Sequence, residues 1–320
     1  MSHVTVIVPS YRRPDDLARC LEGLNRQLYS NYDVAIVVRD SDEKTKELAR
    51  HWHAAPSGYG KSVIEVSETG VLAAMKAGTR KACGSIVAFT DDDAVPRPDW
   101  LANLVRHYAD PRVGGAGGRD VQPGIPAKPG CGVGIVTWYG KLIGNHHIGD
   151  GPAREADVLK GVNMSFRKEL AVFPHDLHGT GAQAHFEVHM CLRARRLGFK
   201  LIYDASAVVD HYPAPRFDED QRGKAVPEAA ANAAYNLQLG ILRWGGSFRA
   251  ASRLVYAALI GDRASPGLGR LAIAWVRGER IVVSSFVPGQ RGHWQGLKRW
   301  VSGANGARIG SANAGMGERE

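Results

Sequence analysis

The first 90 residues alternate between short apolar runs and helix-like stripes. Four runs rich in β-branched residues predict buried strands: 4–10 (VTVIVPS), 33–40, 63–66 and 85–90 (SIVAFT). Three intervening segments predict helices: 14–28 with a leucine at every third or fourth position up to Leu28, 42–53, and 70–82. This alternation predicts an α/β fold with a Rossmann-like, mostly parallel sheet flanked by helices and joined by right-handed crossovers.

The size and composition agree with a folded globular chain. It has 320 residues, of which 44% are hydrophobic and 23% charged, which excludes collagen-like, coiled-coil and wholly disordered classes. That length fits one large α/β domain or two modest ones. The cysteines at 20, 83, 131 and 191 form no C-x-x-C pair, so neither a disulfide framework nor a zinc ribbon is indicated.

The start of the chain, MSHVTVIVPS, lacks the cationic and long apolar regions of a secretory signal. No stretch of about 18 apolar residues occurs in the sequence. We therefore expect a cytoplasmic protein that reaches a membrane, if at all, peripherally on its inner face.

The second part of the chain is less regular. A helix is expected at 100–108, followed by a glycine- and proline-rich region from 113 onward that indicates loops and strand and a boundary toward an acceptor-binding part. A helix at 183–197 closed by Gly198 then precedes two strands, 200–203 and 207–210, which lead to His211.

Three consecutive aspartates follow the strand 85–90. Like charges so close raise one another's pKa, and a divalent cation is the natural way to offset their repulsion. In an extended segment, Asp91 and Asp93 point to the same side while Asp92 faces elsewhere. Few hard oxygen ligands suit Mg²⁺ or Mn²⁺ completed by substrate phosphates. A solvated acidic turn before Pro96 is the plainer interpretation of the three aspartates alone.

Several ordered segments together resemble family 2 glycosyltransferases of the GT-A fold. They are VTVIVPSYRRPDDLARCLEGL, YDVAIVVRDSD, GVLAAMKAG, GSIVAFTDDDAVPRPDWL, GVNMSFRKE and EVHMCLRARRLGFKLIYDASAVVDHY. The resemblance covers about residues 3–212. It implies a GT-A domain over 1–215, with a nucleotide-binding half at about 1–110 and an acceptor half at about 111–215. The implied activity is metal-dependent, inverting transfer of a sugar from a nucleotide-diphosphate donor to a saccharide or lipid-linked acceptor, in cell-surface polysaccharide or glycolipid synthesis.

The same resemblance implies which residues hold the donor and the metal. The donor contacts would come from Pro9, Tyr11, Arg12, Asp40, Lys76, Asp91 and Asp92. Asp91 and Asp93 match the Asp-x-Asp motif, whose first residue approaches the ribose and whose second binds Mn²⁺ or Mg²⁺ on the diphosphate. His211 either approaches this metal or plays a structural role.

Inverting transfer also needs a general base, which the resemblance places at Glu187. Two positions depart from the family pattern: Phe186 stands where a Glu usually precedes the base, and Met75-Lys76 replaces Arg-Asn. Glu187 could instead only cap its helix. A zinc site of His185, Glu187 and His189 is disfavoured, because the zincin pattern has Glu directly after the first His; surface histidines or an acceptor contact fit better.

The positive charge lies in the tail. Residues 241–320 hold 12 Lys and Arg against 4 Asp and Glu, which is +8 of the net +9. Two stripes, Phe248-Ala251-Val255-Leu259 and Leu268-Leu271-Ala272-Trp275-Val276, predict amphipathic helices in a basic helical extension over 216–302. Such helices either bind a membrane surface or pack on the core. Residues 303–320 are expected to be disordered, and no recognised nucleic-acid-binding module is present, so nucleic acid is not an expected partner.

Two other functions remain as alternatives. A sugar-phosphate nucleotidyltransferase would need a glycine-rich loop after the first strand, and SYRRPDD contains no glycine. An inactive carbohydrate-binding scaffold of the same fold is motivated by Phe186 and Met75.

Overall fold

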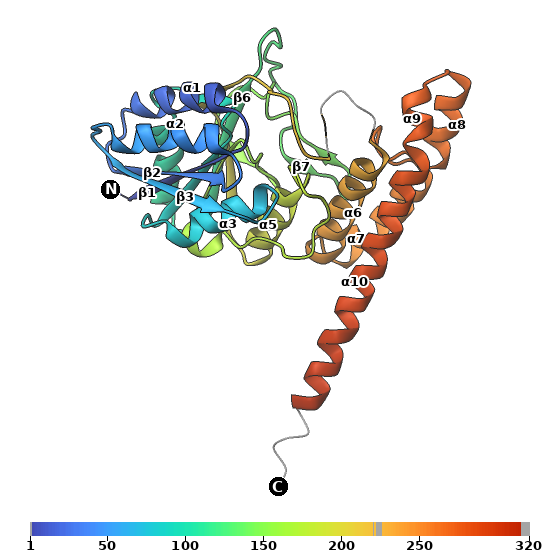
Figure 1. The fold of residues 1–320 in the computed structure, drawn as a ribbon. Coiled ribbons are helices and arrows are strands. Elements are labelled where there is room, and N and C mark those ends of the chain that lie inside the picture. The colour runs from blue at the N-terminus through green and yellow to red at the C-terminus, as the bar shows by residue number, and fades with distance from the viewer. Residues whose placement is uncertain (1, 220, 222–225, 315–320) are drawn as a thin grey trace.

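The computed structural model describes residues 2–219, 221 and 226–314, with side chains up to residue 303. Figure 1 shows a twisted sheet with helices on both faces and a helical C-terminal part at one side of it. The elements of the first half are β1 Val4–Ser10, α1 Pro14–Asn25, β2 Tyr32–Arg39, α2 Glu43–Ala54, β3 Gly60–Val66, α3 Val71–Lys81, β4 Ile86–Thr90, β5 Ala94–Pro96, α4 Trp100–Val105 and the 3₁₀ turn η1 Arg106–Ala109.

The second half supplies the rest of the sheet and the C-terminal helices. Its elements are β6 Val113–Val121, β7 Ile135–Val136, β8 Leu142–Ile143, β9 Arg154–Glu155, β10 Asn163–Arg167, the turn η2 Lys168–Leu170, α5 Phe186–Arg196, β11 Lys200–His211, α6 Pro227–Trp244, α7 Ser247–Leu259, α8 Leu268–Val276, α9 Arg280–Ser284 and α10 Phe286–Ala314.

Within the described residues, nine strands form one sheet in the order β3-β2-β1-β4-β10-β6-β11-β5, with β9 paired to β11. Strands β1 to β4 are parallel, while β10 runs antiparallel between β4 and β6. The predicted α/β fold with a mostly parallel sheet is confirmed. The carboxyl ends of β1, β2, β3 and β4 therefore meet at one edge, where open α/β sheets bind ligands.

Helix α1 shows how the apolar stripes set these layers. Pro14 occupies its first turn, and Leu17, Leu21 and Leu24 are buried against the sheet. The stripe ends there: Leu28 lies beyond the helix and is 75% exposed, so its predicted place in the stripe is wrong. The helix stops at Asn25 because the chain must turn back to start β2.

The glycine-rich segment from 113 forms the strand β6 in the middle of the sheet. A side chain at Gly118 would lie 1.8 Å from the backbone oxygen of Ala207, and one at Gly117 would lie 2.7 Å from that of Asn163. Neighbouring strands approach so closely that only glycine fits. The sequence expectation of mixed loop and strand missed this because glycine weakens every local strand signal.

The two strands expected at 200–203 and 207–210 are one strand, β11. Its register with β6 shifts between Asp204 and Val208, which marks an irregularity in the middle of the strand. Beyond it, His211 pairs with Ala94 of β5. The end of β11 is thereby brought next to the aspartates that follow β4.

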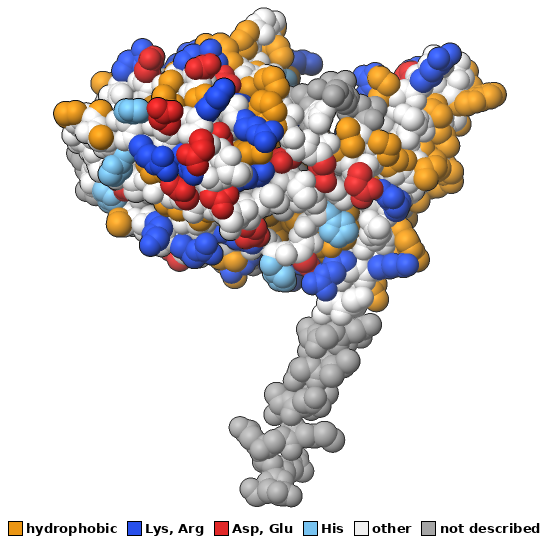
Figure 2. All heavy atoms as spheres, in the orientation of Figure 1, with side chains coloured by type: hydrophobic (Ala, Val, Ile, Leu, Met, Phe, Trp, Pro, Cys, Tyr) orange, Lys and Arg blue, Asp and Glu red, His pale blue; other side chains and the backbone are white. Residues whose placement is uncertain are grey.

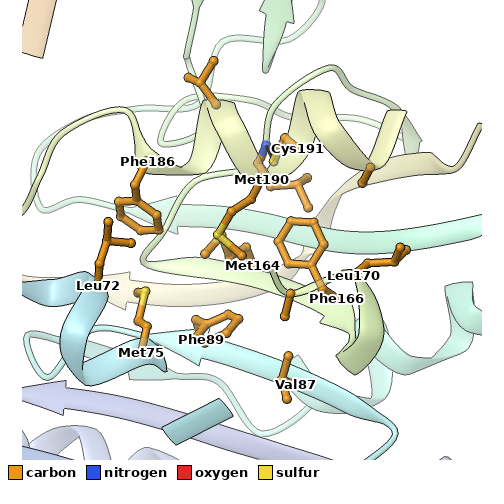
Figure 3. Close-up of a cluster of buried hydrophobic side chains, with 14 of the residues drawn as sticks. Leu72, Met75, Val87, Phe89, Met164, Phe166, Leu170, Phe186, Met190 and Cys191 are labelled. Carbon is orange, nitrogen blue, oxygen red and sulfur yellow. Dashed lines mark hydrogen bonds between the residues drawn. The ribbon is translucent and has the colours of Figure 1, made fainter. Parts of the chain in front are cut away.

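A buried cluster joins α3 and α5 on one face of the sheet (Figure 3). Phe186 and Met190 of α5 contact a layer that includes Met75 of α3 and Phe89 of β4. Phe186 is 6% exposed and Met75 is fully buried. Phe186 and Met75, which both depart from the family pattern, are thus core residues, and Phe186 anchors the first turn of α5 above the sheet.

The C-terminal helices extend from α5. Helix α6 packs on α5, and α10 packs along α6, where the backbone of Gly292 closely approaches Ala231 (Figure 1). Helix α10 continues to Ala314, into the range 303–320 where we expected disorder; residues 315–320 lie outside the described residues. Among the helices that the structure describes, none is both long and apolar enough to cross a bilayer.

Candidate active site

An open cleft lies at the carboxyl edge of the sheet. Its walls come from the ends of β1, β2 and β3, from the first turn of α3, and from a segment that follows β11. Pro9, Tyr11, Asp91 and Asp93 all line it. The structure therefore brings together donor and metal candidates from strands that are far apart in the sequence.

Three side chains converge at the floor of this cleft. Asp91, Asp93 and His211 each offer one ligand atom, and these atoms lie within 4.8 Å of one another; no other such group occurs in the described part of the chain. Two carboxylates and one imidazole form a donor set that fits Mn²⁺ and tolerates Mg²⁺. The residues present therefore fit a divalent cation.

Asp92 points away from this group. It is buried, accepts a hydrogen bond from the Ser10 hydroxyl at 2.7 Å and lies 3.1 Å from Arg13. Burial raises the pKa of Asp92 to about 7, although the Arg13 charge opposes the shift. The structure places Asp92 outside the cleft lining, contrary to the expectation of a donor contact, because the turn at residues 92–93 between β4 and β5 directs it toward Ser10 and Arg13.

His211 belongs to a row of charged side chains, between Asp120 and Asp93. Its Nδ1 lies 3.2 Å from Asp120, and its Nε2 lies 3.4 Å from Asp93. Burial disfavours the charged imidazole, but the two carboxylates outweigh it and raise the pKa of His211 to about 9. Lys160 pairs with the same Asp120. Asp120 thus orients the imidazole that faces Asp93, as outer partners of ligating histidines do.

Arg13 supplies positive charge next to the aspartates. It contacts both Asp92 and Asp93, whose carboxylate also accepts the backbone N–H of Ala214 at 2.9 Å. Burial raises the pKa of Asp93, but hydrogen bonds from His211 and Ala214 hold it well below its usual range. Sequence reasoning chose Arg12, the neighbour of this arginine.

Arg12 itself turns outward. It has a left-handed backbone with φ 58°, and its N–H donates to the Asp42 carboxylate. Its guanidinium lies 5.0 Å from the centre of the Tyr11 ring, and the residue is not part of the cleft lining. The strained turn presents Arg13, not Arg12, to the aspartates.

Tyr11 forms the aromatic wall of the cleft. The Arg39 guanidinium lies 3.8 Å over its ring, and Phe217 meets the ring edge-on with centroids 6.5 Å apart. Arg39 also lies 3.6 Å from Asp218. The segment 215–218 therefore closes the cleft against the end of β1. Asp40, which follows Arg39, is exposed and does not line the cleft.

Lys76 lies in a neighbouring pocket. That pocket is separated from the first by the start of α3 and also contains His175 and Gln183. Since Met75 faces the core, the next residue along the helix points away from the donor cleft. The predicted contact of Lys76 with the nucleotide has no support from this geometry.

Glu187 lies in the first turn of α5 and, like Arg12, Asp40 and Asp92, is not among the residues that line the cleft. Burial raises its pKa to about 7; its own backbone N–H and the charges of Lys160 and Arg216 oppose the shift, and Asp91 adds to it. These are the charged groups that also surround the cleft floor. A carboxyl with a pKa near 7 at this place suits a general base.

The two histidines beside Glu187 do not form a metal site with it. His189 is buried, and its Nε2 donates to the backbone oxygen of Asn236 at 2.8 Å. His185 takes a left-handed backbone with φ 71° just before α5. The expectation of a surface position is wrong for His189, since α6 packs over it.

Comparison with known proteins identifies the family of the first part of the chain. The family model described as Glycosyl transferase family 2 matches residues 5–125. The matched residues therefore form a family 2 glycosyltransferase domain. Glycosyltransferase AglE of Haloferax volcanii is 29% identical over 222 residues, which span 68% of each protein. The glucosyl-dolichyl phosphate glucuronosyltransferase of the same organism is 26% identical over 65% of this chain and 68% of that protein.

A solved structure shows the same fold. The mannosyltransferase PcManGT of Pyrobaculum calidifontis, in complex with GDP-Man and Mn²⁺, superimposes with a TM-score of 0.56 at 20% identity. The match covers 90% of this chain and 87% of that one. At this identity the likeness establishes the GT-A fold of the glycosyltransferase, and not its donor.

The sequence analysis did not identify several residues of the site. Arg13, Asp120, Lys160, Arg216 and Phe217 all lie at or beside the cleft. A clue existed for Arg13, because a triad of aspartates requires nearby positive charge. For the other four no local pattern exists, since they reach the site from β6, from the segment before β10 and from the segment after β11.

Proposed function

We propose that this glycosyltransferase is metal-dependent and inverting, and that it transfers a sugar from a nucleotide-diphosphate donor to a saccharide or lipid-linked acceptor in cell-surface polysaccharide or glycolipid synthesis. The observation that carries the proposal is the convergence of Asp91, Asp93 and His211 at the floor of the cleft. The cleft above them has an aromatic wall at Tyr11 and cationic groups at Arg13 and Arg216.

The metal would be held by Asp91, Asp93 and His211. When bound, Mn²⁺ or Mg²⁺ supplies positive charge that stabilises the departing nucleoside diphosphate. Arg13 and Arg216 add fixed positive charge on the same side of the cleft. Asp120 holds the His211 ring in place, so the ligand set is oriented before the donor arrives.

The donor nucleotide would lie along the ends of β1 and β2. Tyr11 offers a ring face for a base, and Arg39 stiffens that ring by lying over it. Pro9 lines the same wall. The bound GDP-Man and Mn²⁺ in the mannosyltransferase with the same fold support this type of donor, and the base that this chain accepts stays undetermined.

The proposed chemical step uses Glu187 as the base. Its carboxylate takes the proton of the acceptor hydroxyl while the oxygen attacks the anomeric carbon, and the bond from that carbon to the diphosphate oxygen breaks with its electron pair. Attack from the face opposite the leaving group inverts the anomeric centre. Burial of Glu187 makes its conjugate base a stronger proton acceptor.

A lipid-linked acceptor is favoured over a free saccharide by the relatives. One of them is named as acting on a glucosyl-dolichyl phosphate.

The decisive experiment measures hydrolysis and transfer with a panel of UDP-, GDP- and dTDP-sugars, with Mn²⁺, Mg²⁺ or EDTA. We expect one donor class to turn over only with metal, and Asp93→Asn to lose that turnover while melting normally. Turnover that EDTA leaves unchanged would contradict the metal assignment. An anomeric configuration retained in the product would contradict the inverting mechanism.

The nucleotidyltransferase alternative has little support. The turn after β1 has no glycine-rich loop for a triphosphate and instead places Tyr11 and Arg13 at the cleft. The inactive-scaffold alternative has less support, because Asp91, Asp93 and Glu187, the carboxylates that the proposed chemistry uses, are all present.

A further inference from the structure

Helix α7 presents its apolar stripe to the outside. Phe248, Val255 and Leu259 are 71%, 59% and 52% exposed, whereas Arg253 on the other side of the helix is fully buried. A helix on the surface of a globular protein normally has the opposite arrangement. The stripe therefore faces outward, away from the core of the chain.

The buried arginine fixes this orientation. The Arg253 guanidinium donates to Gln238 Oε1 at 2.9 Å and to the Gly140 backbone oxygen at 3.0 Å, and it lies 3.4 Å from Asp262. Turning the helix to bury Phe248 would break all of these contacts and leave buried polar groups without partners. The outward stripe is thus built into the fold.

The following helices continue the same surface. On α8, Trp275 and Val276 are 73% and 79% exposed, and on α9 Ile281 is 72% exposed. Val287 and Trp294 of α10 are 71% and 57% exposed. Figure 2 shows hydrophobic side chains gathered along the outer edge of these helices. We call this set, with the α7 stripe, the outer apolar surface.

Basic side chains surround the outer apolar surface. Residues 246–303 contain nine Lys and Arg but only two acidic residues, Asp262 and Glu279. Of the nine, Arg253 is buried, Arg291 pairs with Glu228 and Arg299 pairs with Asp176, which leaves six toward solvent. Asp262 is engaged with Arg253, and Tyr256 donates to it at 3.0 Å. Arg277 and Arg280 are exposed beside the apolar residues of α8 and α9. The charge of this surface is complementary to an anionic partner.

We propose that the outer apolar surface docks on a bilayer that contains anionic phospholipid. Short helices with exposed tryptophans, aliphatic residues and arginines match the pattern of helices that lie in the membrane interface. The nine residues of α8 are too few to cross a bilayer, so the helix lies in its plane. The arginines meet phosphate headgroups while the apolar side chains enter the acyl boundary.

The surface is continuous with the acceptor half of the enzyme. Trp138 stacks on Phe248 with ring centroids 6.0 Å apart, and Arg249 donates to the backbone oxygen of Thr137 at 3.1 Å. Val136 in turn belongs to the core cluster that contains Phe186, next to Glu187. The use of this docking, delivery of a lipid-linked acceptor, rests on the proposed function; the docking itself does not.

The test is flotation of the full chain with vesicles, without any substrate. With vesicles of phosphatidylcholine and about 30 mol% phosphatidylglycerol we expect co-flotation, and about tenfold less with phosphatidylcholine alone or at high salt. Trp275→Asp with Val276→Asp should reduce co-flotation about tenfold or more. Leu28→Asp is the matched control: Leu28 is 75% exposed on the opposite part of the molecule, and its variant should float normally.

The outcomes separate this proposal from the others. The proposal of bilayer docking is overturned if the protein fails to float with anionic vesicles, or if the α8 variant floats as well as the unchanged protein. A dimer in light scattering that Trp275→Asp with Val276→Asp converts to a monomer, without vesicle binding, shows that a second copy covers the surface and also overturns it. Donor hydrolysis in solution should be normal in the α8 variant, so loss of flotation with normal hydrolysis leaves the proposed function intact. Flotation without hydrolysis contradicts only that function.

Discussion

Helices α1 and α7 have nearly the same length and similar apolar stripes, yet they present opposite sides to the protein. In α1, Leu17 and Leu24 are fully buried and Arg19 lies outside. In α7, Phe248 is exposed and Arg253 lies inside. The same periodicity therefore says that one face of a helix is apolar, but not that the protein itself covers it.

This difference separates the part of the molecule proposed to carry out the chemistry from the part proposed to dock on a membrane. The half that contains α1 buries its apolar stripes under the sheet and leaves polar groups at the carboxyl edge, where the proposed chemistry lies. The part that contains α7 keeps its apolar stripes outside and is joined to Gly140 by the buried Arg253. Substitutions in one part should therefore abolish donor turnover without affecting membrane docking, and substitutions in the other part should do the reverse.

The largest expected effect is on the chemical side. Asp93→Ala should abolish metal-dependent donor turnover, because it removes one of three converging ligands. Turnover is measured as release of nucleoside diphosphate with and without Mn²⁺, and vesicle flotation should be unchanged. Near-normal turnover would move the metal site elsewhere, and lost flotation would show that the two tasks are coupled.

Glu187→Gln should keep donor binding but lower the transfer rate by about 10²–10⁴-fold, as expected when a general base is lost. Isothermal titration with a nucleoside diphosphate and Mn²⁺ checks binding, and kcat for transfer checks the step. Glu169→Gln is a matched control at another carboxylate, exposed on the turn η2. An unchanged kcat would place the base at another residue.

The same carboxyl predicts a pH profile. Burial raises the pKa of Glu187 to about 7, and only the deprotonated form accepts a proton. The kcat for transfer should therefore fall as the pH is lowered through about 7. A profile that stays flat down to pH 5 would contradict the assignment.

Stability measurements test the comparison directly. Leu17→Ala in α1 should lower the free energy of unfolding by about 2–5 kcal/mol, because it leaves a cavity in the core. Urea unfolding followed by circular dichroism measures the change. A loss below that range would show that the stripe of α1 is less tightly packed than its burial indicates.

Arg253→Ala should have an intermediate effect. It leaves the Gln238 side chain and the Gly140 carbonyl without their buried partner, which costs about 1–3 kcal/mol of unfolding free energy. The same urea titration checks it. A neutral result would mean that the arginine does not fix the orientation of α7.

Val255→Ala should have the smallest effect, within about 0.5 kcal/mol, because the side chain is 59% exposed. The measurement uses the purified protein without vesicles. A destabilisation as large as that of Leu17→Ala would break the comparison, since it would show that the stripe of α7 is a buried core surface.

Much of the fold of the first 110 residues could be predicted from the sequence. Strands β1, β2 and β4, the start of α1 at Pro14 and the pairing of Asp91 with Asp93 on one side follow from patterns within a few residues. The family resemblance added Tyr11 and His211 to the same cleft. The structure brings Tyr11, Asp91 and Asp93 to one cleft, and each of these expectations depends on a local period or on the end of a strand. The roles of these residues in catalysis stay predictions.

Other predictions missed because close approach of distant segments decides them. Arg13 rather than Arg12 meets the aspartates, since the turn after β1 puts Arg12 in a left-handed conformation. The position of Gly118 in a central strand requires glycine, because the Ala207 backbone leaves no room for a side chain. The sequence alone does not show this close approach. Lys76 points to another pocket because its neighbour in the helix is needed in the core.

By itself, the sequence determined which segments form strands and helices, that acid groups follow β4, and that the C-terminal helices are amphipathic and basic. Only the tertiary structure decided that Arg13 meets those acid groups, that Asp120 holds His211 beside them, and that α7 turns its apolar side outward. The physical reason is range: hydrophobic periodicity and strand ends are properties of a few neighbouring residues. The burial of a side chain and the partners of a charge depend on which remote segment packs against it.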